Sequence, residues 1–123
     1  MNLNQIHNVF FIGIGGIGMS ALARWFNHVG IKVSGYDRTP SPLTDALVAE
    51  GMEIVFEDTL ENIPSRIRYD KVHTLIIWTP AMPKDSIQLN FFQNNGYSIK
   101  KRTGEQFGWI QSTAGHRALG TAY

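Results

Sequence analysis

A glycine-rich turn that directly follows an apolar run is the feature that most constrains the fold. Residues 9–12 are all apolar and are β-branched or aromatic, which is typical of a strand buried on both faces. The chain then continues as Gly13-Ile14-Gly15-Gly16-Ile17-Gly18. Over residues 17–29 apolar side chains recur every three or four positions up to Gly30, which predicts a helix. Together these segments predict a strand, a tight turn and a helix in succession.

The rest of the chain continues this alternation of strands and helices. Residues 74–79 form a second strongly apolar run halted by Pro80, which predicts a central parallel strand. Residues 57–70 are polar and predict a loop with at most one helical turn. Further strands are predicted at 31–36, 53–56 and 97–100, and further helices at 42–51 and 86–94. The pattern predicts an α/β fold: a Rossmann-like open parallel sheet of about five strands with helices on both faces.

Composition narrows the classes of partner. The 123 residues suffice for one domain, and a formal net charge of +1 argues against nucleic acid or an anionic membrane surface as the main partner. The absence of cysteine excludes disulfides and thiolate chemistry and fits a cytoplasmic protein. The start of the chain does not resemble a signal peptide, and no apolar run approaches the roughly 20 residues of a membrane helix. The four histidines show no zinc-type spacing, so no metal site is expected.

The glycine turn predicts an anion site. Gly13 would permit the tight turn, Gly15 would let the backbone approach a diphosphate, and Gly18 would allow close packing of helix and strand. The free amides and the positive dipole end of the following helix would face the phosphates. Asp37, at the end of the second predicted strand, would accept hydrogen bonds from ribose hydroxyls, although aspartate before a proline turn is also common in loops. Arg38 would meet a phosphate, stack on a base, or lie exposed in the loop.

Several segments beyond the glycine turn resemble one known family. The sequence is similar to the Mur ligases and, within them, to the UDP-N-acetylmuramate:L-alanine ligases, over roughly residues 6 to 107. The most specific parts of the resemblance are residues 6–23, residues 33–37, Thr79-Pro80-Ala81-Met82-Pro83 and Lys101-Arg102.

The resemblance implies a division of labour between domains. In this family the first domain binds the UDP part of UDP-N-acetylmuramate, the second binds ATP with magnesium, and the third helps to bind the amino acid. Residues 1–111 would therefore be the UDP-N-acetylmuramate-binding domain, with no catalytic residue and no cofactor of their own. By position, the diphosphate would contact Ile14, Gly15, Gly16, Ile17 and Gly18. Asp37 and Arg38 would lie near ribose or uracil, and Thr79, Pro80 and Ala81 would form the opposite wall.

The sequence departs from the family after Lys101-Arg102. The family continues into Gly-Thr-His-Gly-Lys-Thr, an ATP-binding phosphate loop, whereas this chain has no lysine after Lys101. The ATP-binding and C-terminal domains are therefore expected to be absent, and we do not expect the chain alone to catalyse ligation. Residues 112–123 are predicted to be a divergent or poorly ordered tail.

Two other functions fit the same residues. Gly13, Gly15, Gly18 and Asp37 would equally serve an NAD(P)- or FAD-binding oxidoreductase domain. A non-catalytic module that senses a nucleotide is a third hypothesis. The basic run Lys100-Lys101-Arg102 is either solvated charge or a contact to a substrate phosphate.

Overall fold

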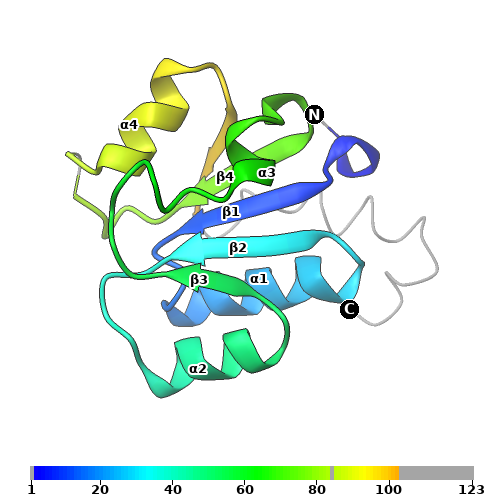
Figure 1. The fold of residues 1–123 in the computed structure, drawn as a ribbon. Helices are drawn as coiled ribbons and strands as arrows, with labels where there is room; N and C mark the ends of the chain where they lie inside the picture. The colour runs from blue at the N-terminus through cyan, green and yellow to red at the C-terminus, as the bar shows by residue number, and fades with distance from the viewer. Residues whose placement is uncertain (1, 84, 103–123) are drawn as a thin grey trace.

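The computed structural model describes residues 2–83 and 85–102, which form a five-stranded parallel sheet. The strands lie in the order β3-β2-β1-β4-β5, and every adjacent pair is parallel (Figure 1). Their bounds are β1 Asn8–Ile12, β2 Lys32–Tyr36, β3 Glu53–Val55, β4 Thr74–Trp78 and β5 Ser98–Lys101. The helices are α1 Ile17–His28, α2 Pro42–Ala49, α3 Ser65–Arg68 and α4 Ile87–Asn94, with 3-10 turns at Leu3–Gln5 and Lys71–His73.

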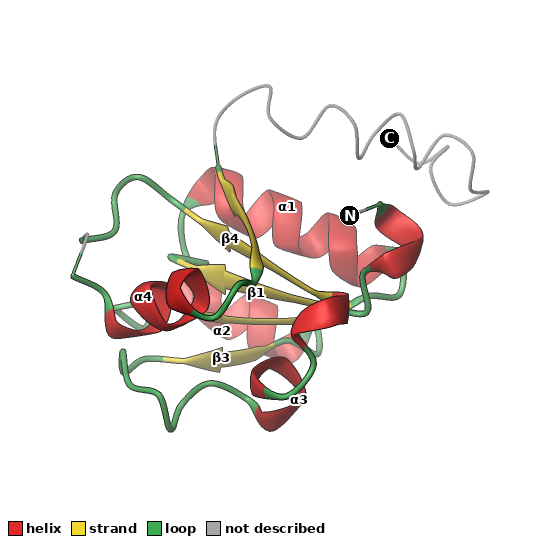
Figure 2. Ribbon diagram, turned by 90° about the horizontal axis from the view of Figure 1, so that it is seen from above, coloured by secondary structure: helices red, strands yellow, loops and turns green. Residues whose placement is uncertain are grey.

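Both faces of the sheet are covered by helices, as predicted. Successive side chains of a strand point to opposite faces. In β1, Val9 and Phe11 join a core with α1 and α2, whereas Phe10 and Ile12 join a second core with α3 and α4. All four side chains are fully buried. Figure 2 looks onto the face covered by α3 and α4, with α1 and α2 behind the strands. The continuous apolar run of β1 is thus explained by burial on both sides.

The strand order reverses at β1. From β1 the chain passes through α1 to β2 and then to β3, whereas β4 lies on the other side of β1. Ile12 at the end of β1 is in register with Tyr36 of β2 and Trp78 of β4. The segments that follow these three strands therefore meet at one edge of the sheet, at the topological switch point where ligands of open α/β sheets bind.

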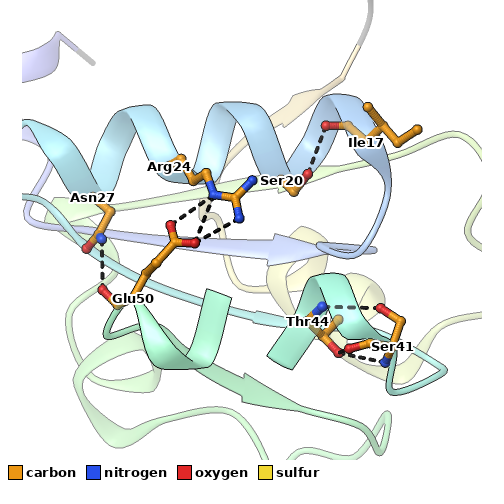
Figure 3. A network of polar contacts seen from close by, with 7 residues as sticks. All are labelled: Ile17, Ser20, Arg24, Asn27, Ser41, Thr44 and Glu50. Atoms are coloured by element: carbon orange, nitrogen blue, oxygen red, sulfur yellow. Dashed lines mark hydrogen bonds and ion pairs between the residues drawn. The ribbon is translucent and has the colours of Figure 1, made fainter. Parts of the chain in front are cut away.

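Polar contacts fasten α1 to the end of α2 (Figure 3). Nε and Nη2 of Arg24 donate to the Glu50 carboxylate at 2.8 to 3.1 Å, and Nδ2 of Asn27 donates to the Glu50 carbonyl oxygen at 3.1 Å. The side chains of Arg24 and Glu50 are exposed, so this ion pair adds little to stability.

The predicted elements agree with the structure to within one or two residues at most ends. The segment 57–70, predicted as a loop with at most one helical turn, contains the four-residue helix α3. The predicted boundary at 111 and the predicted tail at 112–123 lie outside the described residues. Within the described ranges, no helix is long and apolar enough to cross a membrane.

Candidate functional site: the glycine turn and the Thr79 loop

The glycine turn is held against the end of β2. The amides of Gly13 and Ile14 both donate to the carbonyl oxygen of Tyr36, at 2.8 and 3.0 Å. Gly13 has a φ of 94°, a left-handed conformation that glycine adopts without strain. The side chain of Ile14 is fully buried in the core that α1 and α2 cover. Ile14 therefore anchors the turn, and only its backbone lies at the site.

Asp37, which directly follows Tyr36, also fastens the turn. Its Oδ2 accepts the amide of Gly15 at 2.7 Å, and its Oδ1 accepts the amide of Thr39 at 3.0 Å. A Cβ atom on Gly15 would lie 2.6 Å from that Oδ2. Gly15 thus makes room for the Asp37 carboxylate. The sequence suggested a carboxylate free for ribose, whereas the structure shows one already bonded to two amides, with lone pairs remaining on both oxygens.

The first turn of α1 is open to solvent. Gly16 is its N-cap, and no side chain among the described residues caps it. Gly16, Ile17 and Gly18 are exposed, with Ile17 at 86%. The first amides of a helix have no partner within the helix and carry the positive end of its dipole. This turn is therefore the part of the glycine segment best placed to bind an anion.

The loop after β4 packs against the glycine turn. The amide of Thr79 donates to the carbonyl oxygen of Ile12 at 3.3 Å, and its own carbonyl oxygen accepts the amide of Met82 at 3.0 Å. A Cβ atom on Gly13 would lie only 2.5 Å from Cγ2 of Thr79. Pro80 and Ala81 are exposed beside it. The structure thus brings the Thr79 loop and the glycine turn together at one edge.

Arg102 also reaches this edge, although the sequence assigned it no place in the site beyond that of a basic run and of the family resemblance. Its amide donates to the carbonyl oxygen of Trp78 at 2.7 Å. A Cβ atom on Gly18 would lie 3.1 Å from Nη2 of Arg102, and the three nearest atoms all belong to this guanidinium. The expected role of Gly18, close packing of helix against strand, is therefore corrected: the missing side chain leaves room for Arg102.

Charges at the edge also act on Tyr36. Burial raises the pKa of the Tyr36 hydroxyl, and the carboxylates of Asp58 and Asp37 raise it further, whereas Arg38 lowers it. The hydroxyl is therefore neutral at physiological pH. Arg38 is exposed and forms no ion pair with any residue that the structure describes.

Two histidines that lie far apart in the sequence meet at the opposite edge of the sheet. The rings of His7 and His73 stack at 4.1 Å with an angle of 9° between their planes, and Nδ1 of His73 lies 3.0 Å from Oδ1 of Asp70. One ligand atom from each residue falls within 4.8 Å of the others. Ring lone pairs lie in the ring plane, so parallel rings do not direct them to a common point. The expectation of no metal site stays a prediction, and His116 lies outside the described residues.

The residues of the glycine turn do not fit ATP with magnesium. A phosphate loop needs a lysine and a following hydroxyl after its last glycine. Here Met19 and Ser20 follow Gly18, and the buried Ser20 hydroxyl donates to the carbonyl oxygen of Ile17 at 2.9 Å. This turn therefore lacks the lysine that would hold the β- and γ-phosphates, and its hydroxyl already donates within α1.

Known proteins are similar to this chain in both sequence and fold. The family model described as "Mur ligase family, catalytic domain" matches residues 8–104. UDP-N-acetylmuramate–L-alanine ligase of Flavobacterium johnsoniae is 57% identical over 102 residues, which is 83% of this chain and 22% of that protein. The ligase of the same name from Cytophaga hutchinsonii is 52% identical over 103 residues, again 22% of its length.

A solved structure gives the same result. The UDP-N-acetylmuramate-alanine ligase of Thermotoga maritima superposes with a TM-score of 0.69 at 26% identity, covering 90% of this chain and 23% of that chain. This chain thus spans about a fifth of the length of the curated relatives that it matches. The family model matches most of the chain, and the relatives are identical to it at about half of its residues. Both findings confirm the family that the resemblance predicted. The chain belongs to the Mur ligase family.

Proposed function

We propose that this chain binds the UDP part of UDP-N-acetylmuramate, as the first domain of an ATP-dependent UDP-N-acetylmuramate:L-alanine ligase of peptidoglycan synthesis. The observation that carries the proposal is the uncapped first turn of α1 at the switch point of the sheet, directly after the glycine turn whose Gly13 packs against Thr79. An uncapped helix terminus at this place is suited to a diphosphate. The names of the relatives support the choice of nucleotide.

The hydrogen bonds of the glycine turn indicate which of its amides remain available for a diphosphate. The amides of Ile14 and Gly15 donate to protein acceptors, so they shape the turn. The amide of Gly16 donates to the carbonyl oxygen of Gly13, at a longer 3.3 Å. We assign the diphosphate chiefly to the amides of Ile17 and Gly18, at the open start of α1.

The other site residues keep their proposed places around the nucleotide. Asp37 and Arg38, which follow β2, would lie near ribose or uracil. Thr79, Pro80 and Ala81, which follow β4, would form the opposite wall. None of these side chains is proposed to act on the reacting carboxylate, so the contribution of this domain is to bind and orient the substrate.

We propose that the steps that use ATP and the amino acid take place outside this domain. The relatives are about five times as long as the matched region. We propose that ATP with magnesium and the amino acid bind in domains outside the matched region, and that the ATP-binding domain is the main protein partner of this one. A cytoplasmic location follows from that proposal, because ATP is supplied there.

Calorimetric titration of the chain with UDP-N-acetylmuramate, UDP, NAD⁺ and NADH tests the proposal. We expect saturable binding of both UDP compounds at one site, and no binding of the dinucleotides. Tight NAD⁺ binding without a response to UDP would instead support the oxidoreductase hypothesis. Light scattering on the same samples addresses the sensing module, since a ligand-induced change in oligomeric state would favour it.

A further inference from the structure

Arg102 is positioned by its backbone at the mouth of the site. It follows β5, and its amide donates to Trp78 at the end of β4. From there its side chain lies over Gly18 in the first turn of α1, where a Cβ atom would come within 3.1 Å of Nη2. Three segments far apart in the sequence thus bring a guanidinium beside the amides assigned to the diphosphate.

The guanidinium has no counter-ion within the described ranges. The ion pairs there are Arg24 with Glu50, Arg66 with Glu53, and His73 with Asp70. Asp37, the carboxylate of the glycine turn, accepts two backbone amides and forms no ion pair with Arg102. Arg102 is half-buried, and its positive charge lies beside the open start of α1 with no ion-pair partner among the described residues.

The two lysines before Arg102 are placed differently. Lys100 and Lys101 are exposed, and Nζ of Lys101 lies 5.8 Å from the centre of the Trp78 ring, where a cation–π contact engages it. The three atoms nearest a Cβ on Gly18 all belong to Arg102, and none to either lysine. This difference gives a matched control, because Lys100 carries the same charge two positions away.

We propose that Arg102 is a diphosphate-binding residue: its guanidinium and the first-turn amides of α1 hold the same phosphate group from two sides. The planar fork of arginine donates two parallel hydrogen bonds to phosphate oxygens, whereas a lysine acts as a point charge. Glycine at position 18 leaves this room free, because a Cβ atom there would lie 3.1 Å from Nη2 and the guanidinium would have to shift. The inference rests on the proposed function and adds a charged side chain to a site otherwise made of backbone amides.

The test compares ligands with and without phosphate. Calorimetric titration of the full chain with UDP and with uridine is carried out for the wild type, Arg102→Gln, Arg102→Lys and Lys100→Gln. We expect Arg102→Gln to weaken UDP binding roughly 10- to 100-fold, the range for loss of charge-assisted hydrogen bonds, and to change uridine binding less than about twofold. Arg102→Lys should recover part of the loss, and Lys100→Gln should bind UDP nearly as the wild type does.

The outcomes separate the inference from the proposed function. If the wild type binds UDP and Arg102→Gln binds it equally well, the role of Arg102 is wrong and the proposed function stands. An equal loss for UDP and uridine, or for Lys100→Gln and Arg102→Gln, also overturns the role. If the wild type binds no UDP compound, the proposed function fails and this inference fails with it. Circular dichroism and thermal unfolding of each variant show whether it folds as the wild type does.

Discussion

Replacing Gly15 with valine is expected to abolish measurable UDP binding, with a loss on the order of 100-fold or more. A Cβ atom at this position would lie 2.6 Å from Oδ2 of Asp37 and 3.3 Å from Cγ2 of Thr44, so the carboxylate must leave the turn. Without its bond to Asp37 the turn no longer presents the start of α1. Losing two hydrogen bonds to a charged phosphate costs about 3 kcal/mol, which corresponds to roughly 100-fold in affinity. Calorimetry with UDP measures the change.

Gly16→Ala is the matched control for this variant. The nearest atoms to a Cβ on Gly16 lie at 3.8 Å, an ordinary contact distance, and its backbone is extended. We expect it to fold and to retain most of the UDP affinity. If Gly15→Val binds UDP as tightly as Gly16→Ala does, the turn is not the diphosphate site.

A double-mutant cycle addresses the case in which Gly15→Val does not fold. The milder Gly15→Ala should destabilise the chain by about 1 to 3 kcal/mol, because it displaces the Asp37 carboxylate. In an Asp37→Ala background the same change should cost much less, since the clash is gone. Urea denaturation measures the four free energies of unfolding. An equal cost in both backgrounds would show that Asp37 does not fasten the turn.

Gly35→Ala is expected to lower the free energy of unfolding by about 3 kcal/mol, the upper part of the range for overpacking a core. Gly35 lies in β2 between Phe11 of β1 and Ile54 of β3. A Cβ atom there would lie 2.8 Å from the carbonyl oxygen of Phe11 and 2.9 Å from Cδ1 of Ile14. The first is a backbone atom of the central strand and the second belongs to a fully buried side chain, so neither moves away easily. Urea denaturation measures the loss.

Gly51→Ala is the control for Gly35→Ala, because it adds the same methyl group at a position where no atom crowds it. Gly51 has a φ of 99° and open space around its Cβ position, so alanine there meets only the backbone penalty of about 1 to 2 kcal/mol. We expect Gly35→Ala, whose φ is not left-handed, to be the more destabilising of the two. The opposite order would mean that β1 and β2 move apart to accept a side chain.

The sequence predicted the architecture because the signals for it are local. The buried run of β1, the glycine turn and the periodicity of α1 occupy one continuous stretch, and the Pro80 stop marks the end of β4 in the same way. The elements themselves needed only patterns of neighbouring residues. The place of the Thr79 loop opposite the glycine turn came from the resemblance to the Mur ligases.

The contacts inside the site could not be predicted in this way. Asp37 bonds to Gly15 across 22 positions, and that geometry depends on how far β2 extends before the chain turns. In the sequence, Gly35 looks like an ordinary strand residue. The side chain that occupies the space beside it belongs to Ile14, in another segment. Arg102 lies over Gly18 only because β5 is the outer neighbour of β4. Each contact is decided by three-dimensional packing, and local sequence carries no signal for it.

The bond between Asp37 and Gly15 links two proposed parts of the site, the place of the ribose and the start of α1. In dinucleotide-binding folds the acidic residue after the second strand hydrogen-bonds the ribose. Here the carboxylate secures the turn that precedes α1. On the proposed function, a substitution of Asp37 made to change the nucleotide would therefore also weaken the proposed diphosphate site, and compensating changes in the turn would have to accompany it.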